Sequence, residues 1–156
     1  MKITIGRIDK ADFPELSLEE IDIKIDSGAY TSSIHCSDIE EVTIKNNPCI
    51  RFTLLDPEHP FYNHKEFTSQ HYTSKIVKSS NGISEKRFMI QTEIVLFNTT
   101  FPIYLTLTER KDMKFPILLG RKFLNKKFVI DTAKTNLSFK LKNIKTNENS
   151  YSIKKP

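Results

Sequence analysis

A turn of small residues at the end of an alternating strand is the feature that most constrains this sequence. Over residues 21–26 isoleucines alternate with polar residues, and this period of two predicts a half-buried β-strand. The strand delivers the carboxylate of Asp26 into a turn made by Ser27, Gly28 and Ala29. Glycine allows a tight turn and the close approach of another backbone segment. Because Asp-Ser-Gly also occurs in ordinary turns, this stretch alone leaves a purely structural turn open.

A second motif lies near the C-terminal end of the chain. Residues 115–119 form an apolar run that ends at Gly120 and continues into Arg121 and several helix-forming residues. The run predicts a buried strand, which is also what an ordinary core strand looks like. The segment after it predicts a short helix with four residues on one side, namely Phe123, Leu124, Lys127 and Phe128.

In this order, the two motifs resemble the catalytic turn and the closing strand of retropepsin-like aspartic proteases. In those proteins a strand ending in Gly-Arg crosses beside the catalytic turn, leads into a helix and closes a ψ-loop. The chain looks most like the bacterial retropepsin-like family often labelled "ATP-dependent zinc protease", and the resemblance spans roughly residues 3–131. The matching segments are residues 5–7, Leu16, 24–29, 31–35, 77–82, 85–87, 105–110 and 118–121.

The resemblance implies an all-β fold, the closed β-barrel of acid proteases, with one short helix after the Leu-Leu-Gly-Arg strand. It implies that Asp26 is catalytic. It further implies two supporting sets: Ser27, Gly28, Ala29 and Thr31 for the active-site turn and the dimer, and Leu119, Gly120 and Arg121 for the ψ-loop.

The implied chemistry is hydrolysis of a peptide bond by a water held between two carboxylates that share one proton. One carboxylate acts as the base and the other donates a proton to the scissile carbonyl. The chain is too short for two lobes, so the resemblance implies a homodimer in which Asp26 of each subunit meets at the two-fold axis. Asp131-Thr132-Ala133 mimics a second such turn. Because Ala133 replaces the glycine and no second Leu-Leu-Gly strand follows, we interpret it as a hairpin turn.

One position departs from the viral pattern. Viral retropepsins commonly place an acid after the catalytic turn, where it pairs with the arginine of the Gly-Arg motif, but this chain has Tyr30 there. We therefore expect Arg121 to pair with another acid, Asp22 or Glu109, or the dimer to be held differently.

Two functions stay open. The first is an aspartic endopeptidase acting on peptides or proteins. The second is a catalytically silent retropepsin-like module that binds a peptide or an ATP-grasp ligase, because members of the family are often associated with ATP-grasp ligases that add glutamate to proteins.

The residues give the zinc and ATP label little support, since there is no phosphate loop and no His-Glu-x-x-His helix. The spacing of His59, His64 and His71 matches no common zinc pattern. We expect no metal and no other cofactor.

Length and charge limit the class of protein that this sequence can encode. The 156 residues predict one domain over 1–142 and a polar tail over 143–156. The net charge is +5, but the basic residues are scattered without a nucleic-acid-binding signature, so we expect a solvated surface that can help an acidic or glutamylated substrate approach. No apolar run reaches the ~20 residues of a membrane span, and the N-terminus has no signal-peptide core. We expect a cytoplasmic protein that binds neither nucleic acid nor membrane, with Cys36 and Cys49 as reduced thiols.

The remaining strands are predicted as hairpins. Residues 32–41 read as irregular, and hairpins are expected across 46–48, 79–82 and 98–100, with a last hairpin joining 128–130 to 137–141. Residues 55–90 occupy the chain position of the retropepsin flap, either in the 79–82 hairpin or in the loop before it. We favour residues around 60–78 as facing the substrate.

Overall fold

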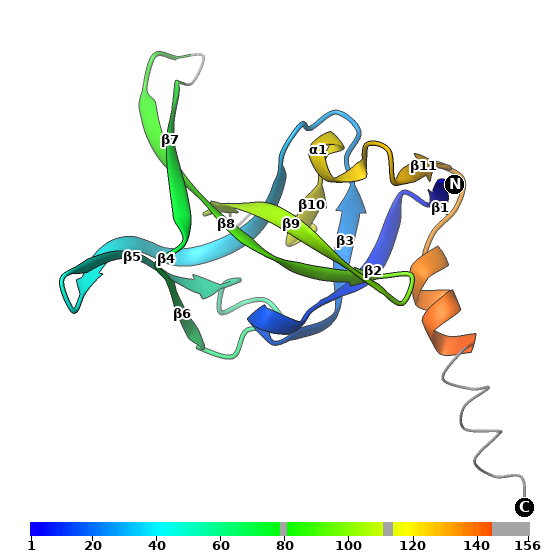
Figure 1. Cartoon of the computed structure of the whole chain (residues 1–156), viewed down its shortest axis with the longest axis horizontal. Coiled ribbons are helices and arrows are strands. Elements are labelled where there is room, and N and C mark those ends of the chain that lie inside the picture. Colours follow the sequence, from blue (N-terminus) through cyan, green and yellow to red (C-terminus); the bar gives the residue numbers. More distant parts are fainter. Residues whose placement is uncertain (79–80, 111–113, 145–156) are drawn as a thin grey trace, which may run out of the picture.

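Eleven strands and three short helical segments make up the computed structural model, which describes residues 1–78, 81–110 and 114–144 (Figure 1). The strands are β1 (Ile3–Ile5), β2 (Ile8–Phe13), β3 (Leu18–Ile25), β4 (Ser32–Ile44), β5 (Asn47–Leu54), β6 (Glu66–Ser69), β7 (Tyr72–Lys78), β8 (Ser84–Leu96), β9 (Thr99–Thr108), β10 (Ile117–Leu119) and β11 (Phe128–Ile130). The helical segments are the 3₁₀ helix η1 (Pro14–Leu16), α1 (Arg121–Leu124) and a helix over residues 137–144. Among the described residues, no helix has the length and apolar character needed to cross a membrane.

Six strands close into a mixed barrel. They pair in the order β10-β3-β2-β8-β9-β4, and a second pairing of β10 with β4 completes the ring. The pairs β10–β3 and β4–β9 are parallel, and the others are antiparallel. Closure removes the open sheet edges that would otherwise invite association. The prediction of an all-β retropepsin-like barrel is confirmed.

The period-two pattern of the sequence fills the barrel. Ile21, Ile23 and Ile25 are buried on β3, and they pack with apolar residues from β4, β9 and β10. Full burial of one such side chain stabilises the fold by about 1.5–3 kcal/mol. The strand that carries Asp26 is therefore fixed along its whole length by the core.

Residues 32–44 form the long strand β4, so the prediction of an irregular segment is wrong for residues 32–41. The inward positions include Ser32, whose small polar side chain hides the alternation in the sequence. β4 and β5 form the expected hairpin, but its turn lies at Lys45 and Asn46, with φ of 49° and 67°. Two consecutive left-handed residues match the twist of the flanking strands. The β7–β8 and β8–β9 hairpins are also present, and residues 79–80 of the first turn lie outside the described residues.

The predicted last hairpin is wrong, because residues 137–144 are helical and β11 pairs in parallel with β1. The buried carboxylate of Asp9 on β2 caps this helix, accepting hydrogen bonds from the amides of Ser138 at 2.8 Å and Phe139 at 3.1 Å. The short helix α1 follows β10 as predicted, but it ends at Leu124, and Phe128 begins β11. Residues 145–156 of the predicted tail lie outside the described residues.

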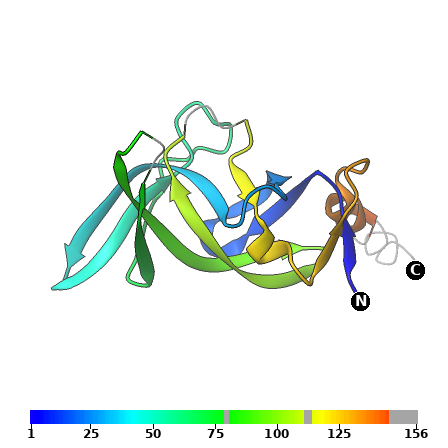
Figure 2. The same ribbon diagram turned by 90° about the horizontal axis from the view of Figure 1, so that it is seen from above.

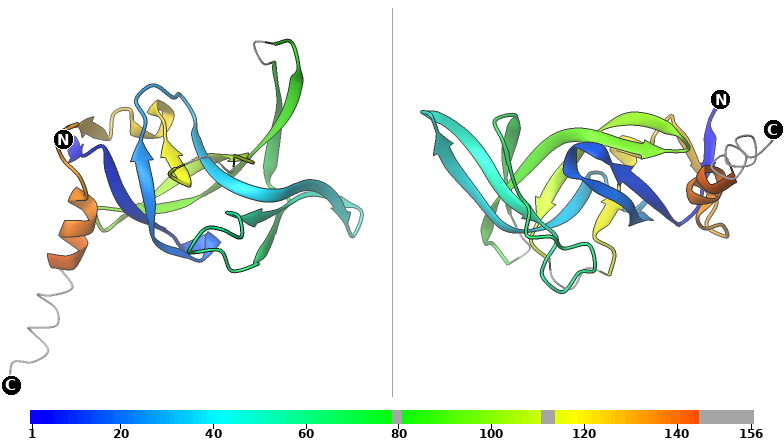
Figure 3. Two further views of the ribbon diagram at one scale, coloured as in Figure 1. Left: turned by 180° about the vertical axis from the view of Figure 1, so that it is seen from behind. Right: turned by 90° about the horizontal axis from the view of Figure 1, so that it is seen from below.

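The two ends of the molecule are formed by different elements. β1 and the 137–144 helix lie at one end, and the β4–β5 hairpin reaches out at the other (Figure 2). The same arrangement is seen from behind and from below in Figure 3. The end of β3, with the loop that carries Asp26, lies between them beside α1.

Candidate active site

The Asp26 turn is held by its own backbone. Asp26 follows β3 directly, and its Oδ1 accepts a hydrogen bond of 3.0 Å from the amide of Gly28. The amide of Ala29 donates to the carbonyl of Asp26 at 3.2 Å, and the amide of Asp26 donates to the carbonyl of Leu119 at 2.9 Å. Asp26 is half-buried. The carboxylate is thus oriented at the surface by a local turn and by the neighbouring strand.

The second motif lies directly beside this turn. β10 pairs in parallel with β3, which precedes the turn, and in antiparallel with β4, which follows it. The strand therefore runs between the two arms of the catalytic loop, as in a ψ-loop. The amide of Arg121 donates to the carbonyl of Ala29 at 2.8 Å, and the amide of Gly120 donates to the buried Oγ of Ser32 at 3.0 Å.

Gly120 is required by this close approach. A Cβ built on it would lie 2.6 Å from the carbonyl oxygen of Thr31 and 2.8 Å from the carbonyl carbon of Tyr30. No side chain fits at such distances, so only glycine lets the strand pass the turn.

In the part of the chain that the structure describes, Arg121 contacts the turn without an acidic partner. Its Nη1 donates a hydrogen bond of 2.9 Å to the carbonyl of Ser27, and its guanidinium lies 5.8 Å from the ring centre of Tyr30. Asp22, a predicted partner, instead pairs with Lys10 at 2.9 Å. The expected pairing with Asp22 or Glu109 is therefore wrong within the described residues. A backbone carbonyl and an aromatic face replace it.

A groove with several cations begins at the turn. A pocket of about 420 Å³ is lined by Tyr30, Thr31, Lys75 and Arg87, among others. It continues through Thr31, Met89 and Lys122 into a second pocket of about 320 Å³, which is also lined by Lys127 and Tyr104. We call these two pockets the cationic groove. None of the described residues that line it is acidic.

The β7–β8 hairpin, which stands away from the barrel in Figure 1, forms one wall of this groove. Thr73 and Lys75 of β7 and residues 87–89 of β8 line the first pocket. Residues 61 and 63 line a different pocket, with η1 and the start of β3. Of the two flap positions considered in the sequence, the hairpin is the one beside the Asp26 turn, and the first part of the favoured segment 60–78 is not.

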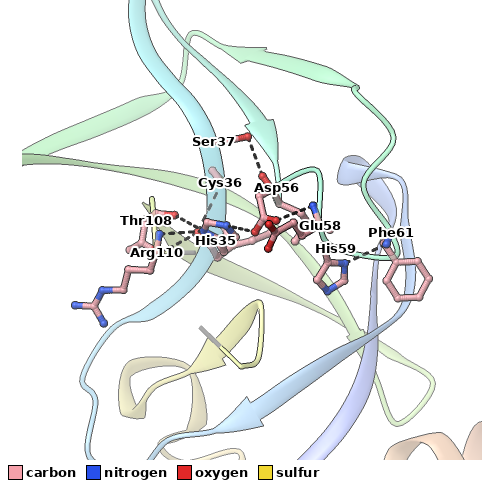
Figure 4. A network of polar contacts seen from close by, with 11 residues as sticks. His35, Cys36, Ser37, Asp56, Glu58, His59, Phe61, Thr108 and Arg110 are labelled. Atoms are coloured by element: carbon pink, nitrogen blue, oxygen red, sulfur yellow. Dashed lines mark hydrogen bonds and ion pairs between the residues drawn. The ribbon is translucent and has the colours of Figure 1, made fainter. Parts of the chain in front are cut away.

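A partly buried polar network surrounds His35 on β4, the strand that follows the Asp26 turn (Figure 4). The Nε2 of His35 lies 2.7 Å from Oδ2 of Asp56, and its Nδ1 accepts a hydrogen bond of 3.0 Å from the amide of Arg110. The backbone amide of His35 donates to the carbonyl of Pro116 at 2.8 Å. Nδ1 also lies 3.3 Å from the carbonyl of Thr108, but the shorter contact with the amide of Arg110 requires it to accept. With Nδ1 as the acceptor, the ring proton is on Nε2, which donates to the carboxylate. One residue of β4 thereby holds the segments before and after residues 111–113, and so fixes the approach to β10.

Asp56 is the charged member of this network. Burial alone would raise its pKa, but hydrogen bonds from the amide of Glu58 and from His35 lower the pKa overall. The roles of Ser32 and of the His35–Asp56 pair as supports were not predicted from the sequence. The only signal for Ser32 and His35 was their place in the matching segment 31–35. Asp56 carried no signal, because it lies in a loop with ordinary turn residues.

No metal centre is found among the described residues. Within them, no group of three or more His, Cys, Asp or Glu side chains comes together that could hold a metal ion. The Nδ1 of His59 accepts from the amide of Phe61 at 3.0 Å, and the ring of His64 packs on Tyr62. Cys36 and Cys49 are buried free thiols, and burial raises the pKa of Cys36.

Residues 4–140 match the family model "Retropepsin-like aspartic endopeptidase RimB". The chain belongs to the RimB-like family of retropepsin-like aspartic endopeptidases. The resemblance seen in the sequence is thereby confirmed at the level of the family.

Several relatives are longer proteins. Two are each named "Probable alpha-L-glutamate ligase": one from Shewanella pealeana is 35% identical over 138 residues, and one from Desulfotalea psychrophila is 34% identical over 136 residues. The matches cover 86% and 85% of this chain but only 29% and 28% of those proteins. The chain thus spans less than a third of the length of these relatives. A crystal structure of a Legionella pneumophila protein of unknown function is similar over 88% of this chain and 99% of its own, with a TM-score of 0.65 and 26% identity.

Proposed function

We propose that this chain is an aspartic endopeptidase in which Asp26 activates water for the hydrolysis of peptide bonds. The observation that carries the proposal is the placement of Asp26 in a ψ-loop closed by Gly120. Asp26 does not itself line the cationic groove, which begins at Tyr30 and Thr31 of the same loop. The half-buried carboxylate is oriented by the amide of Gly28. Membership of the retropepsin-like family supports the same chemistry.

The mechanism needs a second carboxylate, and we propose that it is the Asp26 of a second copy of the chain. Two carboxylates about 3 Å apart cannot both be ionised, so the pair holds one proton between them. One carboxylate then removes a proton from water while the other donates a proton to the scissile carbonyl. Ser27, Gly28 and Ala29 are exposed or half-buried beside Asp26, which leaves the turn open to a partner.

The groove favours a substrate with negative charge. Lys75, Arg87 and Lys122 line the pocket nearest to the turn, and Lys122 and Lys127 line the next one. The relatives named as glutamate ligases suggest where such charge originates, because a ligase of that name produces glutamate-bearing products. We therefore propose that a glutamate-rich peptide segment occupies the groove, and that the β7–β8 hairpin covers it as a flap.

The proposal is tested by incubating the wild type and Asp26→Asn with a mixture of glutamate-rich and neutral peptides, with a chelator present throughout. We expect the wild type to cleave the acidic peptides and Asp26→Asn to leave them intact. Equal cleavage by both proteins would overturn the proposal.

A second candidate function is favoured by the short match to the ligases, since a domain that is joined to an enzyme in other proteins often serves to bind. In this alternative the groove holds the glutamate-bearing chain without cutting it. Tight binding of the same peptides by wild type, with no cleavage by either protein, would select this function.

A further inference from the structure

Residues 131–134 repeat the geometry of the Asp26 turn bond by bond. The amide of Ala133 donates to Oδ1 of Asp131 at 3.0 Å, as the amide of Gly28 does to Oδ1 of Asp26. The amide of Lys134 donates to the carbonyl of Asp131 at 3.1 Å, which reproduces the bond from Ala29 to Asp26. The interpretation of Asp131-Thr132-Ala133 as a hairpin turn is therefore wrong.

The second turn also has its own closing strand, and this strand precedes it in the chain. β1 pairs in parallel with β11, and Ile5 opposes Ile130 as Leu119 opposes Ile25. The amide of Asp131 donates to the carbonyl of Ile5 at 2.9 Å, the same length as the bond from Asp26 to Leu119.

Gly6 and Arg7 correspond to Gly120 and Arg121. A Cβ on Gly6 would collide with the carbonyl oxygen of Lys134. The amide of Arg7 donates to that carbonyl at 2.9 Å, and its Nη1 donates to the carbonyl of Thr132 at 3.3 Å. The chain thus holds two copies of one module: an Asp turn, and a strand that passes it and ends in Gly-Arg.

The two copies differ in their surroundings. The Asp26 copy has glycine at position 28, and Thr31, two residues beyond Ala29, lines the cationic groove. The Asp131 copy has Ala133 in place of that glycine, and none of its residues lines the groove. Residues 26–29 do not line the groove either, so the copies differ in the segment that follows each turn: Tyr30 and Thr31 line the groove, whereas residues 135 and 136 do not.

One residue joins the copies. The carbonyl of Arg7 accepts a hydrogen bond of 2.9 Å from the amide of Ile25, the residue immediately before Asp26, while the amide of Arg7 is held by Lys134. We propose that the Asp131 turn, with Gly6 and Arg7, is a non-catalytic positioning module that fixes Asp26 through the carbonyl of Arg7. The effect on catalysis rests on the proposed peptidase function, whereas the effect on Ile25 does not.

The two aspartates should respond oppositely to the same conservative change. Asparagine keeps Oδ1 as an acceptor, so Asp131→Asn keeps the second turn, whereas Asp131→Ala removes the acceptor from the amide of Ala133. At position 26 asparagine also keeps the turn but removes the reacting carboxylate. Asn63→Ala is a matched control, because Oδ1 of Asn63 accepts from the amide of Lys65 at 3.0 Å in a similar local turn that is not part of either module.

The experiment measures kcat, KM and the hydrogen exchange of the Ile25 amide in full-length wild type and in these variants. We expect Asp131→Ala to lower kcat by about tenfold with little change in KM, and to speed exchange at Ile25 but not at Leu105 in the barrel core. Asp131→Asn and Asn63→Ala should behave as wild type.

Unchanged exchange at Ile25 in Asp131→Ala would overturn the positioning role even in a protein without peptidase activity. Equal loss of activity in Asp131→Asn and Asp26→Asn, with normal exchange, would also overturn it, since Asp131 would then be a reacting group. Absence of cleavage by wild type, with faster exchange at Ile25 in Asp131→Ala, would refute the peptidase function and leave the module intact.

Discussion

Gly120 passes the carbonyl of Thr31 so closely that a Cβ on the glycine would lie 2.6 Å from that oxygen. The contact joins the end of β10 to the loop that carries Asp26. The hydrogen bond from the Gly120 amide to the Oγ of Ser32 also connects these two segments. The position of Asp26 therefore depends on a backbone contact between residues far apart in the chain.

Gly120→Ala should be among the most damaging single changes. The added methyl collides with backbone atoms, which cannot rotate aside, and overpacking of this kind costs about 1–3 kcal/mol or more. We expect a lower free energy of unfolding in urea and a loss of any activity that needs Asp26. Gly82→Ala separates backbone strain from collision, because a Cβ there meets nothing within 4 Å while the φ of 81° disfavours alanine, so it should lose less stability than Gly120→Ala. Equal stability of Gly120→Ala and wild type would contradict the described contact.

Replacing His35 with Asn or Gln should lower the free energy of unfolding less than replacing it with Ala. Asparagine can accept from the amide of Arg110 in place of Nδ1, and glutamine can donate to Asp56 in place of Nε2, so each restores one half of the network. We expect His35→Ala to lower the free energy of unfolding by about 1–3 kcal/mol, as for other buried groups left unpaired. The two amide variants should lie between His35→Ala and wild type in a urea titration. A result in which all three variants match the wild type would show that the network does not hold the loop.

The stability of the fold should fall in acid because the carboxylate of Asp56 becomes protonated. Its pKa is lower in the folded protein than the ordinary value of 3.8, because the hydrogen bonds from Glu58 and His35 favour the charged form against the effect of burial. A lowered folded pKa adds stability that is present above the unfolded pKa and is lost as the pH falls through the folded pKa. We expect the melting temperature of wild type to drop below about pH 4.

Asp56→Asn isolates this contribution. The variant should be less stable than wild type at neutral pH, and the difference should shrink as the pH falls below about 4. A difference that stays constant between pH 6 and the acid limit would contradict the assignment to Asp56.

Charge reversal at Lys122 should change the preference for substrates. Lys122 lines both pockets of the cationic groove, and its ammonium lies 4.7 Å from the ring centre of Tyr104. We expect Lys122→Glu to lower kcat/KM for a glutamate-rich peptide by about tenfold, which corresponds to about 1.4 kcal/mol, and to spare a neutral peptide. Lys45→Glu, in the turn of the outlying β4–β5 hairpin, changes the net charge equally and serves as the control. The same loss in both variants would show that overall charge, not the groove, is responsible.

The sequence was informative where a short local pattern determines the structure. The alternation before Asp26 predicts β3, and the apolar run before Gly120 predicts β10, because each strand buries one set of side chains in the core. The pairing of these two strands followed only from the family resemblance, since spacing alone does not say which strands lie side by side.

The errors arose where distant residues decide the structure. Leu137, Phe139 and Leu141 alternate as in a strand, but Asp9, 129 residues away from Ser138, caps this segment as a helix. The strand that closes the Asp131 turn precedes that turn in the chain, whereas the strand that closes the Asp26 turn follows it, so the sequence order of the first motif did not predict the second. Among the described residues Arg121 has no acid partner, and its guanidinium donates to the carbonyl of Ser27 in the turn instead.

The most direct test of the central claim is the peptidase activity of wild type mixed with Asp26→Asn at a fixed total concentration, after the subunits have exchanged. If each active site uses Asp26 from two chains, only dimers with two wild-type subunits cleave, and an equal mixture should keep about one quarter of the activity of pure wild type. Retention of one half would mean that each chain works alone, which would contradict the shared pair of Asp26 carboxylates.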